Sequence, residues 1–123
     1  MPRIVLSLLG LIIITGAGQA RAAAGAEGTL DRTQIREVVI AHMGELRGCY
    51  DQALGRDPNA RGKVVLDFTI GREGAVIRSE VASSDVGDPQ MNECLRVAVG
   101  GWTFPTPDGG VVQVNYPFAF EPG

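Results

Sequence analysis

The sequence of 123 residues contains few of the side chains on which catalytic and metal sites depend. It has one histidine and two cysteines, and the cysteines do not form a C-x-x-C pair. A His/Cys metal site therefore lacks ligands, and a thioredoxin-type dithiol lacks its motif. There are 11 Lys and Arg against 14 Asp and Glu, which gives a net charge of −3. Because the chain has no Lys/Arg-rich run, the phosphate attraction behind nucleic-acid binding has no source, and we expect no nucleic-acid partner.

Charge is also missing from residues 4–20, which open with the apolar run Ile4–Ile14 just after Arg3. Small residues suited to signal peptidase follow at Ala20-Arg21-Ala22. A positive start, an apolar run of about 7–15 residues and an A-x-A site are typical of a secretory signal peptide, which we predict over residues 1–22. Its removal leaves nine Lys and Arg against 14 Asp and Glu, a net charge of −5. The alternative is a retained membrane anchor, although a spanning helix needs about 20 apolar residues.

Export would place the two cysteines in an oxidising compartment, where cysteines usually pair. Cys49 and Cys94 allow a single intramolecular pairing, and we predict that they form a disulfide. Closing a loop of about 45 residues would stabilise the domain by about 4 kcal/mol in the chain-entropy model. A redox dithiol and a metal pair are the alternatives, and the missing C-x-x-C motif and the single histidine disfavour both.

Hydrophobic periodicity predicts a helix at the start of the folded domain. Asp31 is a suitable N-cap, and apolar residues recur at helical spacing through Leu54. Gly44 and Gly48 each cost this helix about 1 kcal/mol relative to alanine. We interpret them as positions where another element approaches the helix closely. The preceding residues 23–30 are rich in alanine and glycine, and we expect a flexible tail there.

Strand-like patterns dominate the rest of the chain. Residues 62–70 and 75–82 flank a glycine-containing turn, as in a β-hairpin. Asp followed by Pro begins a second, shorter helix over 88–101, and a final strand runs over 111–120. The order α-β-β-α-β predicts an α+β domain over 31–121, in which two helices cover one face of a three-stranded, mainly antiparallel sheet.

The final strand carries the candidate binding site. Pro117 has no N–H, so we expect this part of the strand at a sheet edge or past the last ladder bond. An edge strand can take up a partner strand through main-chain hydrogen bonds. The candidate partner-binding residues are Val114, Tyr116, Pro117 and Phe118.

No catalytic constellation emerges from the remaining motifs. His42 falls on the apolar side of the first helix, where we expect a half-buried packing residue whose ring nitrogen has a partner. Ser83-Ser84-Asp85 has no G-x-S-x-G context and is typical of a turn. The acidic residues between 85 and 93 miss the spacing of an EF-hand calcium loop. We therefore predict no catalytic residues, no metal and no cofactor.

Several residues together resemble a known family. The pattern consists of Cys49-Tyr50, Gly62-x-Val64, Phe68-x-Ile70, Gly74-x-Val76, Ser83-Ser84, Cys94, Trp102-x-Phe104-Pro105 and Tyr116-Pro117-Phe118. It resembles the AgmX/PglI C-terminal domain family, an envelope module associated with gliding bacteria and similar to the TonB C-terminal domain. The resemblance covers about residues 31–121, and its structural motif residues are Tyr50, Trp102, Phe104 and Pro105.

The resemblance implies an α+β fold, no enzymatic activity and a protein-contact role in the cell envelope. The chain departs from TonB because it lacks a proline-rich spacer and, if the signal is cleaved, an inner-membrane anchor, so energy transduction does not follow. We expect a periplasmic or secreted module that binds envelope proteins by strand addition. One alternative is binding of peptidoglycan or another envelope glycan through Trp102–Pro107. Another is a periplasmic hydrolase or redox protein that uses His42 or the cysteine pair.

Overall fold

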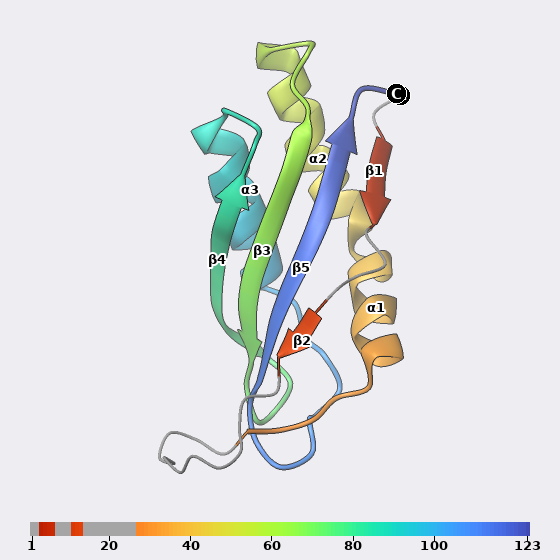
Figure 1. Cartoon of the computed structure of the whole chain (residues 1–123), viewed down its shortest axis with the longest axis vertical. Coiled ribbons are helices and arrows are strands. Elements are labelled where there is room, and N and C mark those ends of the chain that lie inside the picture. The colour runs from red at the N-terminus through yellow and green to blue at the C-terminus, as the bar shows by residue number, and fades with distance from the viewer. Residues whose placement is uncertain (1–2, 7–10, 14–26) are drawn as a thin grey trace.

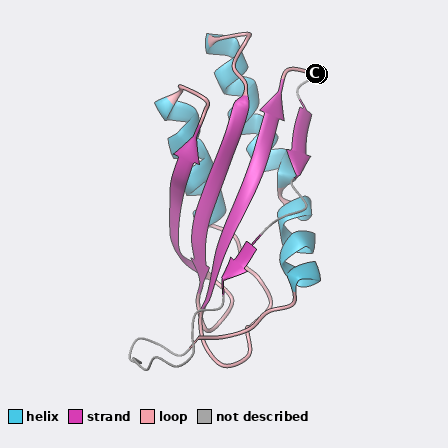
Figure 2. Cartoon of the chain, in the orientation of Figure 1, coloured by secondary structure: helices cyan, strands magenta, loops and turns pink. Residues whose placement is uncertain are grey.

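Helices cover one face of an antiparallel sheet in the computed structural model, which describes residues 3–6, 11–13 and 27–123 (Figures 1 and 2). The elements confirm the α+β class, and the order α-β-β-α-β holds when the first two helices are taken as one helical region. In chain order the elements are β1 (Arg3–Leu6), β2 (Leu11–Ile13), α1 (Arg32–Ala41), α2 (Met43–Arg56), β3 (Gly62–Ile70), β4 (Val76–Ser84), α3 (Pro89–Gly100) and β5 (Val112–Glu121).

The three long strands lie in the order β4-β3-β5, with β3 at the centre (Figure 1). β3 and β5 pair without a register shift from Gly62↔Phe120 to Ile70↔Val112. The pairing of β3 with β4 is less regular, because the register shifts at two points. On its other side β5 pairs antiparallel with β1 and β2, so β5 separates β3 from the two short N-terminal strands.

The hydrophobic core fills the space between the sheet and the helices. Alternate residues of β3 and β5 face the helices and are buried, because side chains of a strand point to opposite faces in turn. Helix α3 packs on β4 and α2 packs on α3 (Figure 1). Every buried hydrophobic residue of the described chain lies between Leu30 and Phe120. Ile4 of β1 is partly buried and packs against this core.

The single helix expected through Leu54 is divided in two. α1 ends at Ala41 and α2 begins at Met43, because His42 has φ −106° and ψ 10°, outside helical geometry. Gly44 lies in the first turn of α2, and its low helix propensity favours a break at this point. The break makes two helices out of one continuous hydrophobic pattern.

The interpretation of Gly44 and Gly48 as points of close approach is wrong. A Cβ at either position would meet no atom within 4 Å apart from the helix's own backbone. Close approach occurs instead at Gly74, whose φ is +96° and whose missing Cβ would collide with the carbonyl oxygen of Phe104. Glycine is thus required in the hairpin turn and not in the helix.

The flexible tail expected over 23–30 lies only partly within the described residues. Residues 23–26 fall outside them, whereas 27–30 pair with the loop before β5. Gly28 donates its N–H to the carbonyl of Val111 (2.6 Å), and Thr29 exchanges main-chain hydrogen bonds with Asp108 (2.8 and 2.9 Å). Leu30 is 9% exposed and joins the core. Residues 27–30, just before the predicted N-cap Asp31, are therefore paired with the rest of the domain.

The predicted signal peptide falls mostly outside the described residues. Its cleavage site at Ala20-Arg21-Ala22 lies there, and of residues 1–22 only β1 and β2 are described. Among the described residues, the structure has no helix of the length and apolar character needed to span a bilayer.

Candidate functional site

The four candidate partner-binding residues lie together on β5, and three of their side chains are buried in the core. Val114, Tyr116 and Phe118 face the helices and are between 0% and 5% exposed. Pro117 is half-buried on the opposite face of the sheet. These side chains contribute mainly to the fold, so a strand that pairs with β5 meets its main chain. We define the outer edge of β5 as the main-chain groups of residues 112–121 on the side away from β3.

The outer edge of β5 takes two antiparallel strands in this structure. The expectation that Pro117 lies at a sheet edge or past the last ladder bond is wrong, because Pro117 pairs with Val65 inside the β3–β5 ladder and β5 lies between β3 and the N-terminal strands. The pairs are Arg3↔Glu121, Ile4↔Phe120, Val5↔Ala119 and Leu6↔Phe118 for β1, and Leu11↔Asn115, Ile12↔Val114 and Ile13↔Gln113 for β2.

The opposite edge of the sheet, on β4, is protected against strand addition. The two register shifts between β3 and β4 distort the strand. Arg78 and Glu80 place an ion pair (2.8 Å) along it. At its start, the N–H of Val76 bonds to the carbonyl of Trp102 (3.3 Å). Irregular pairing, charged side chains and a covering segment all hinder the addition of another strand at a sheet edge. β5, by contrast, is regular against β3 and carries no charged residue from 112 to 120.

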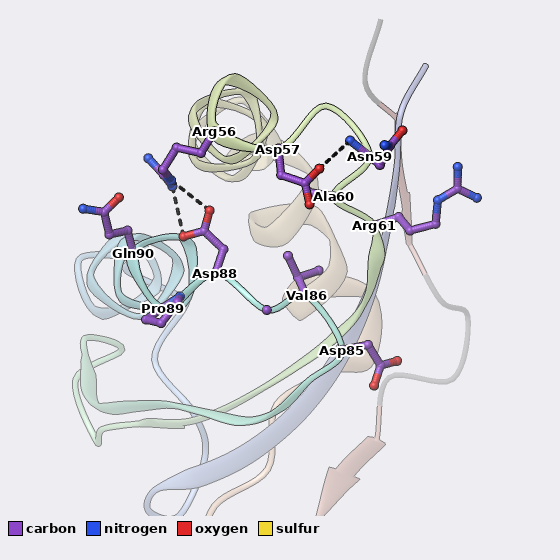
Figure 3. Close-up of a pocket in the computed structure, with 11 residues that line it drawn as sticks. Arg56, Asp57, Asn59, Ala60, Arg61, Asp85, Val86, Asp88, Pro89 and Gln90 are labelled. Carbon is purple, nitrogen blue, oxygen red and sulfur yellow. Dashed lines mark hydrogen bonds and ion pairs between the residues drawn. The ribbon is translucent and has the colours of Figure 1, made fainter.

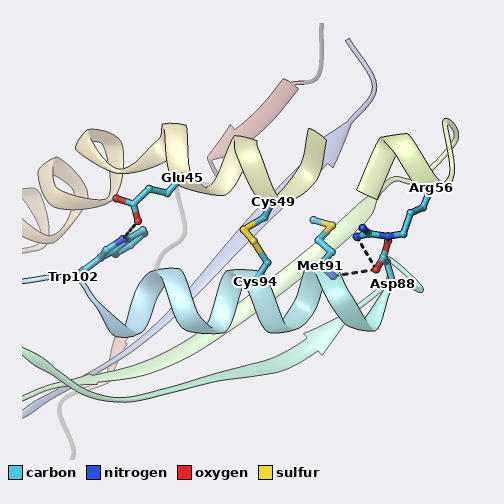
Figure 4. The surroundings of a disulfide bond; sticks show 7 residues. All are labelled: Glu45, Cys49, Arg56, Asp88, Met91, Cys94 and Trp102. Atoms are coloured by element: carbon cyan, nitrogen blue, oxygen red, sulfur yellow. Dashed lines mark hydrogen bonds and ion pairs between the residues drawn. A yellow bond between two sulfur atoms is a disulfide. The ribbon is translucent and has the colours of Figure 1, made fainter. Parts of the chain in front are cut away.

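The predicted disulfide between Cys49 and Cys94 is confirmed (Figure 4). Cys49 lies in α2 and Cys94 in α3, and their Cα atoms are 5.7 Å apart. Cys49 is only 2% exposed. The bridge joins the two helices that cover the same part of the sheet, and it leaves neither cysteine as a free thiol.

A pocket of about 510 Å³ lies where the loops after α2 and before α3 meet (Figure 3). Its main feature is the contact between Arg56 and Asp88, in which Nε donates to Oδ2 at 2.9 Å and Nη2 donates to Oδ1 at 3.1 Å. Asp88 is also the N-cap of α3 and accepts the N–H of Met91 at 3.0 Å. The hydrogen bond from Arg56 lowers the pKa of the Asp88 carboxyl, against the smaller opposing effect of its burial.

Among the charged residues that line this pocket, Arg56 and Asp88 connect the end of α2 to the start of α3. Asp57 accepts the N–H of Asn59 within its own turn (3.0 Å), and Arg61 and Asp85 point away from the Arg56–Asp88 pair (Figure 3). Across the part of the chain that the structure describes, no group of three or more His, Cys, Asp or Glu side chains is arranged to hold a metal ion. The pocket therefore offers no converging set of groups for chemistry.

His42 is a packing residue, as predicted. Its Nδ1 donates to the carbonyl of Val38 (2.8 Å), and its half-buried ring lies 4.9 Å from the Trp102 ring, between centroids. Trp102 in turn donates from Nε1 to the Glu45 carboxylate (3.1 Å; Figure 4). The sequence pattern missed Glu45, because its contact with Trp102 joins residues that are 57 positions apart.

The aromatic motif residues form part of the core. Trp102 and Phe104 are 2% and 3% exposed, and Tyr50 is fully buried. The Tyr50 hydroxyl donates to the carbonyl of Ala60 (2.6 Å), and burial raises the pKa of this phenol. Pro105 is exposed. Glycan binding through Trp102–Pro107 would need an accessible aromatic face, and neither ring in this segment provides one.

No family model matches this chain, and no curated protein or solved structure matches it. Its site is therefore interpreted from its own geometry.

Proposed function

We propose that this protein is an exported, non-catalytic module of the bacterial cell envelope that recruits an extended protein segment along the outer edge of β5. The supporting observation is the difference between β4, at one edge of the sheet, and the outer side of β5, which pairs with β1 and β2. β5 accepts antiparallel strands on its outer side, whereas β4 carries shifts, charges and a covered start. Strand addition obtains affinity from main-chain hydrogen bonds, so it does not require the buried side chains of β5 to move.

The export part of this proposal is supported by the disulfide and by the N-terminal residue pattern. A structural disulfide is typical of oxidising compartments such as the periplasm. The charge-free run after Arg3 has the length of a signal sequence. Membership of the AgmX/PglI C-terminal domain family, with its TonB-like fold, belongs to the same proposal and rests on the residue pattern that carries the resemblance. Under this proposal the protein lies in the periplasm or outside the cell, in contact with other envelope proteins.

The absence of catalysis is proposed from how the reactive side chains are engaged. His42 holds the end of α1 through Val38 and stacks on Trp102. Cys49 and Cys94 are joined to each other. Ser84 bonds within its own turn, to the main chain of Val86. Each of these groups has a structural partner.

Site-specific photo-crosslinking in the native envelope tests the proposal. A photoreactive residue at Gln113 or Glu121, both exposed on β5, should give a discrete protein adduct. The matched controls are Glu80 and Ala82, exposed positions on the protected edge of β4, which should give none. Adducts from β4 alone, equal adducts from both edges, or no adduct from any position would contradict strand addition at β5.

A further inference from the structure

We infer that β1 is an internal stand-in for the partner strand. While residues 1–22 remain attached, Arg3–Leu6 occupy the outer edge of β5. Their removal opens that edge to a segment of another protein with the same chemistry: a basic residue followed by aliphatic residues, antiparallel to β5. This inference rests on the proposed function, since it describes the occupant of the same edge and how access to that edge is regulated.

Ile4 supplies the side-chain contact of β1 that the structure describes. It is half-buried and packs against the hydrophobic core from the sheet edge. Its partner in the register is Phe120, which is 1% exposed and packs on Tyr50 with ring centroids 5.2 Å apart. β1 also contacts α2. Ile4 therefore closes the end of the core between β5 and α2, and an aliphatic side chain of a partner would fill the same place.

The charge pattern defines the remaining chemistry of the partner. β5 is uncharged from 112 to 120 and ends in Glu121. The residue opposite Glu121 in the register is Arg3, so the two strands place residue types of opposite charge at facing positions. Directly opposed charges of opposite sign stabilise an antiparallel pair and help to fix its register. An apolar strand without the basic residue would lose this cue for the register.

The part of the chain that remains after removal of residues 1–22 carries the interactions that hold α2 and α3 together and on the sheet. All the buried hydrophobic residues of the described chain lie between Leu30 and Phe120. The complete pairing of β3 with β5 and the Cys49–Cys94 bridge also lie within this part. Of the side chains of β1, the structure describes Ile4, which is partly buried and packs against the core. The N-terminal strand is thus a removable occupant, and its loss exposes an unpaired, apolar edge.

Peptide binding to the full chain and to residues 23–123 tests this inference. The probe is a fluorescent peptide that carries the Arg3–Leu6 sequence between soluble flanks, and binding is read by fluorescence polarisation. We expect the 23–123 domain to bind it at least ten times more tightly than the full chain, in which the edge is occupied. The control peptides Ile4→Asp and Arg3→Glu should each bind at least ten times more weakly. Equal affinity of the two protein forms, or no loss with Ile4→Asp, would overturn the inference.

Hydrogen exchange provides a readout that is independent of peptide affinity. In the full chain, the β5 amides that face β1 and β2, over 113–115 and 118–121, should be protected as well as the amides that face β3. In the 23–123 domain, alternate amides should lose protection at least tenfold while those that bond to β3 keep it. The same protection pattern in both forms would contradict occupancy by β1. A near-UV spectrum and an intact disulfide establish that the shorter form is folded.

These results separate the inference from the proposed function. If crosslinking at Gln113 and Glu121 captures a partner whose contact segment lacks a basic-aliphatic strand, strand addition stands and the stand-in role of β1 fails. If the peptide binds only the 23–123 domain but the envelope crosslinks show no partner at β5, the intramolecular occupancy stands and the proposed function fails.

Discussion

A disulfide between Cys49 and Cys94 joins α2 to α3. The Cα atoms of the two cysteines lie 5.7 Å apart, although the residues are 45 positions apart in the sequence. A domain of about 100 residues commonly has only about 5–15 kcal/mol of folding stability. A cross-link of this span therefore accounts for a substantial part of it. The fold, and with it the outer edge of β5, depends on helices that stay packed on one face of the sheet.

We expect the double substitution Cys49→Ala with Cys94→Ala to lower the free energy of unfolding by about 4 kcal/mol, because the unfolded chain regains the entropy of an open 45-residue loop. Denaturant titration of the variant and the oxidised protein measures the difference. Intact mass with and without reductant should differ by about two daltons, the two hydrogens that reduction adds to a disulfide. An unchanged unfolding midpoint would contradict a stabilising role for the bridge.

Gly48→Ala should stabilise the protein by about 1 kcal/mol, because alanine is the better helix former and its methyl group meets open space. The matched control is Gly74→Ala, which should destabilise it, since Gly74 has φ +96° and lies against the Phe104 carbonyl. Thermal or denaturant unfolding of both variants checks this. A loss of stability in Gly48→Ala would show that this face of α2 is covered by a contact absent from the described chain.

Tyr50→Phe should cost about 1–3 kcal/mol, because it removes the hydroxyl and leaves the Ala60 carbonyl without its buried donor. Tyr116→Phe is the control, since among the described residues the Tyr116 hydroxyl has no side-chain hydrogen bond of this kind. Equilibrium unfolding measures both changes. Equal effects of the two substitutions would mean that the hydrogen bond from Tyr50 contributes little.

Asp88 should make stability depend on pH in the acid range. Its pKa is lower in the folded protein, owing first to the hydrogen bond from Arg56, so its stabilising effect is present above the unfolded pKa of about 4. This effect is lost as the pH falls through the folded pKa. Asp88→Ala should cost about 1 kcal/mol at pH 7 through loss of the N-cap. Asp88→Asn keeps a capping oxygen and removes the charge.

Unfolding free energies at pH 7 and pH 3 check this dependence. The difference between the natural protein and Asp88→Asn should narrow at pH 3, because this pH is below the unfolded pKa of about 4 and the unfolded state then binds the proton. Glu93→Gln serves as the control, because the Glu93–Arg96 pair lies on the exposed surface of α3, where ion pairs contribute little. A difference that stays constant from pH 7 to pH 3 would mean that the Asp88 charge does not stabilise the fold.

Local patterns in the sequence predicted the helices and strands well, because periodicity and capping act among neighbouring residues. The N-caps Asp31 and Asp88 are both confirmed, and each accepts a main-chain N–H of the first helical turn. The break at His42 was missed. The apolar pattern continues through it, and the ring of His42 stacks on Trp102, which lies 60 positions away. Such a contact leaves no trace in local spacing.

The sequence by itself determined the α+β class, the two helix starts and the pairing of the only two cysteines. Only the tertiary structure decided which sheet edge is protected and which accepts a strand. It placed Arg78 and Glu80 on the irregular β4, and Ile4 opposite Phe120 on the regular β5. The physical reason is that the neighbours on its two sides define the place of a strand in the sheet, and β5 has β3 on one side and β1 and β2 on the other. That depends on pairing between distant segments and on no residue pattern within one of them.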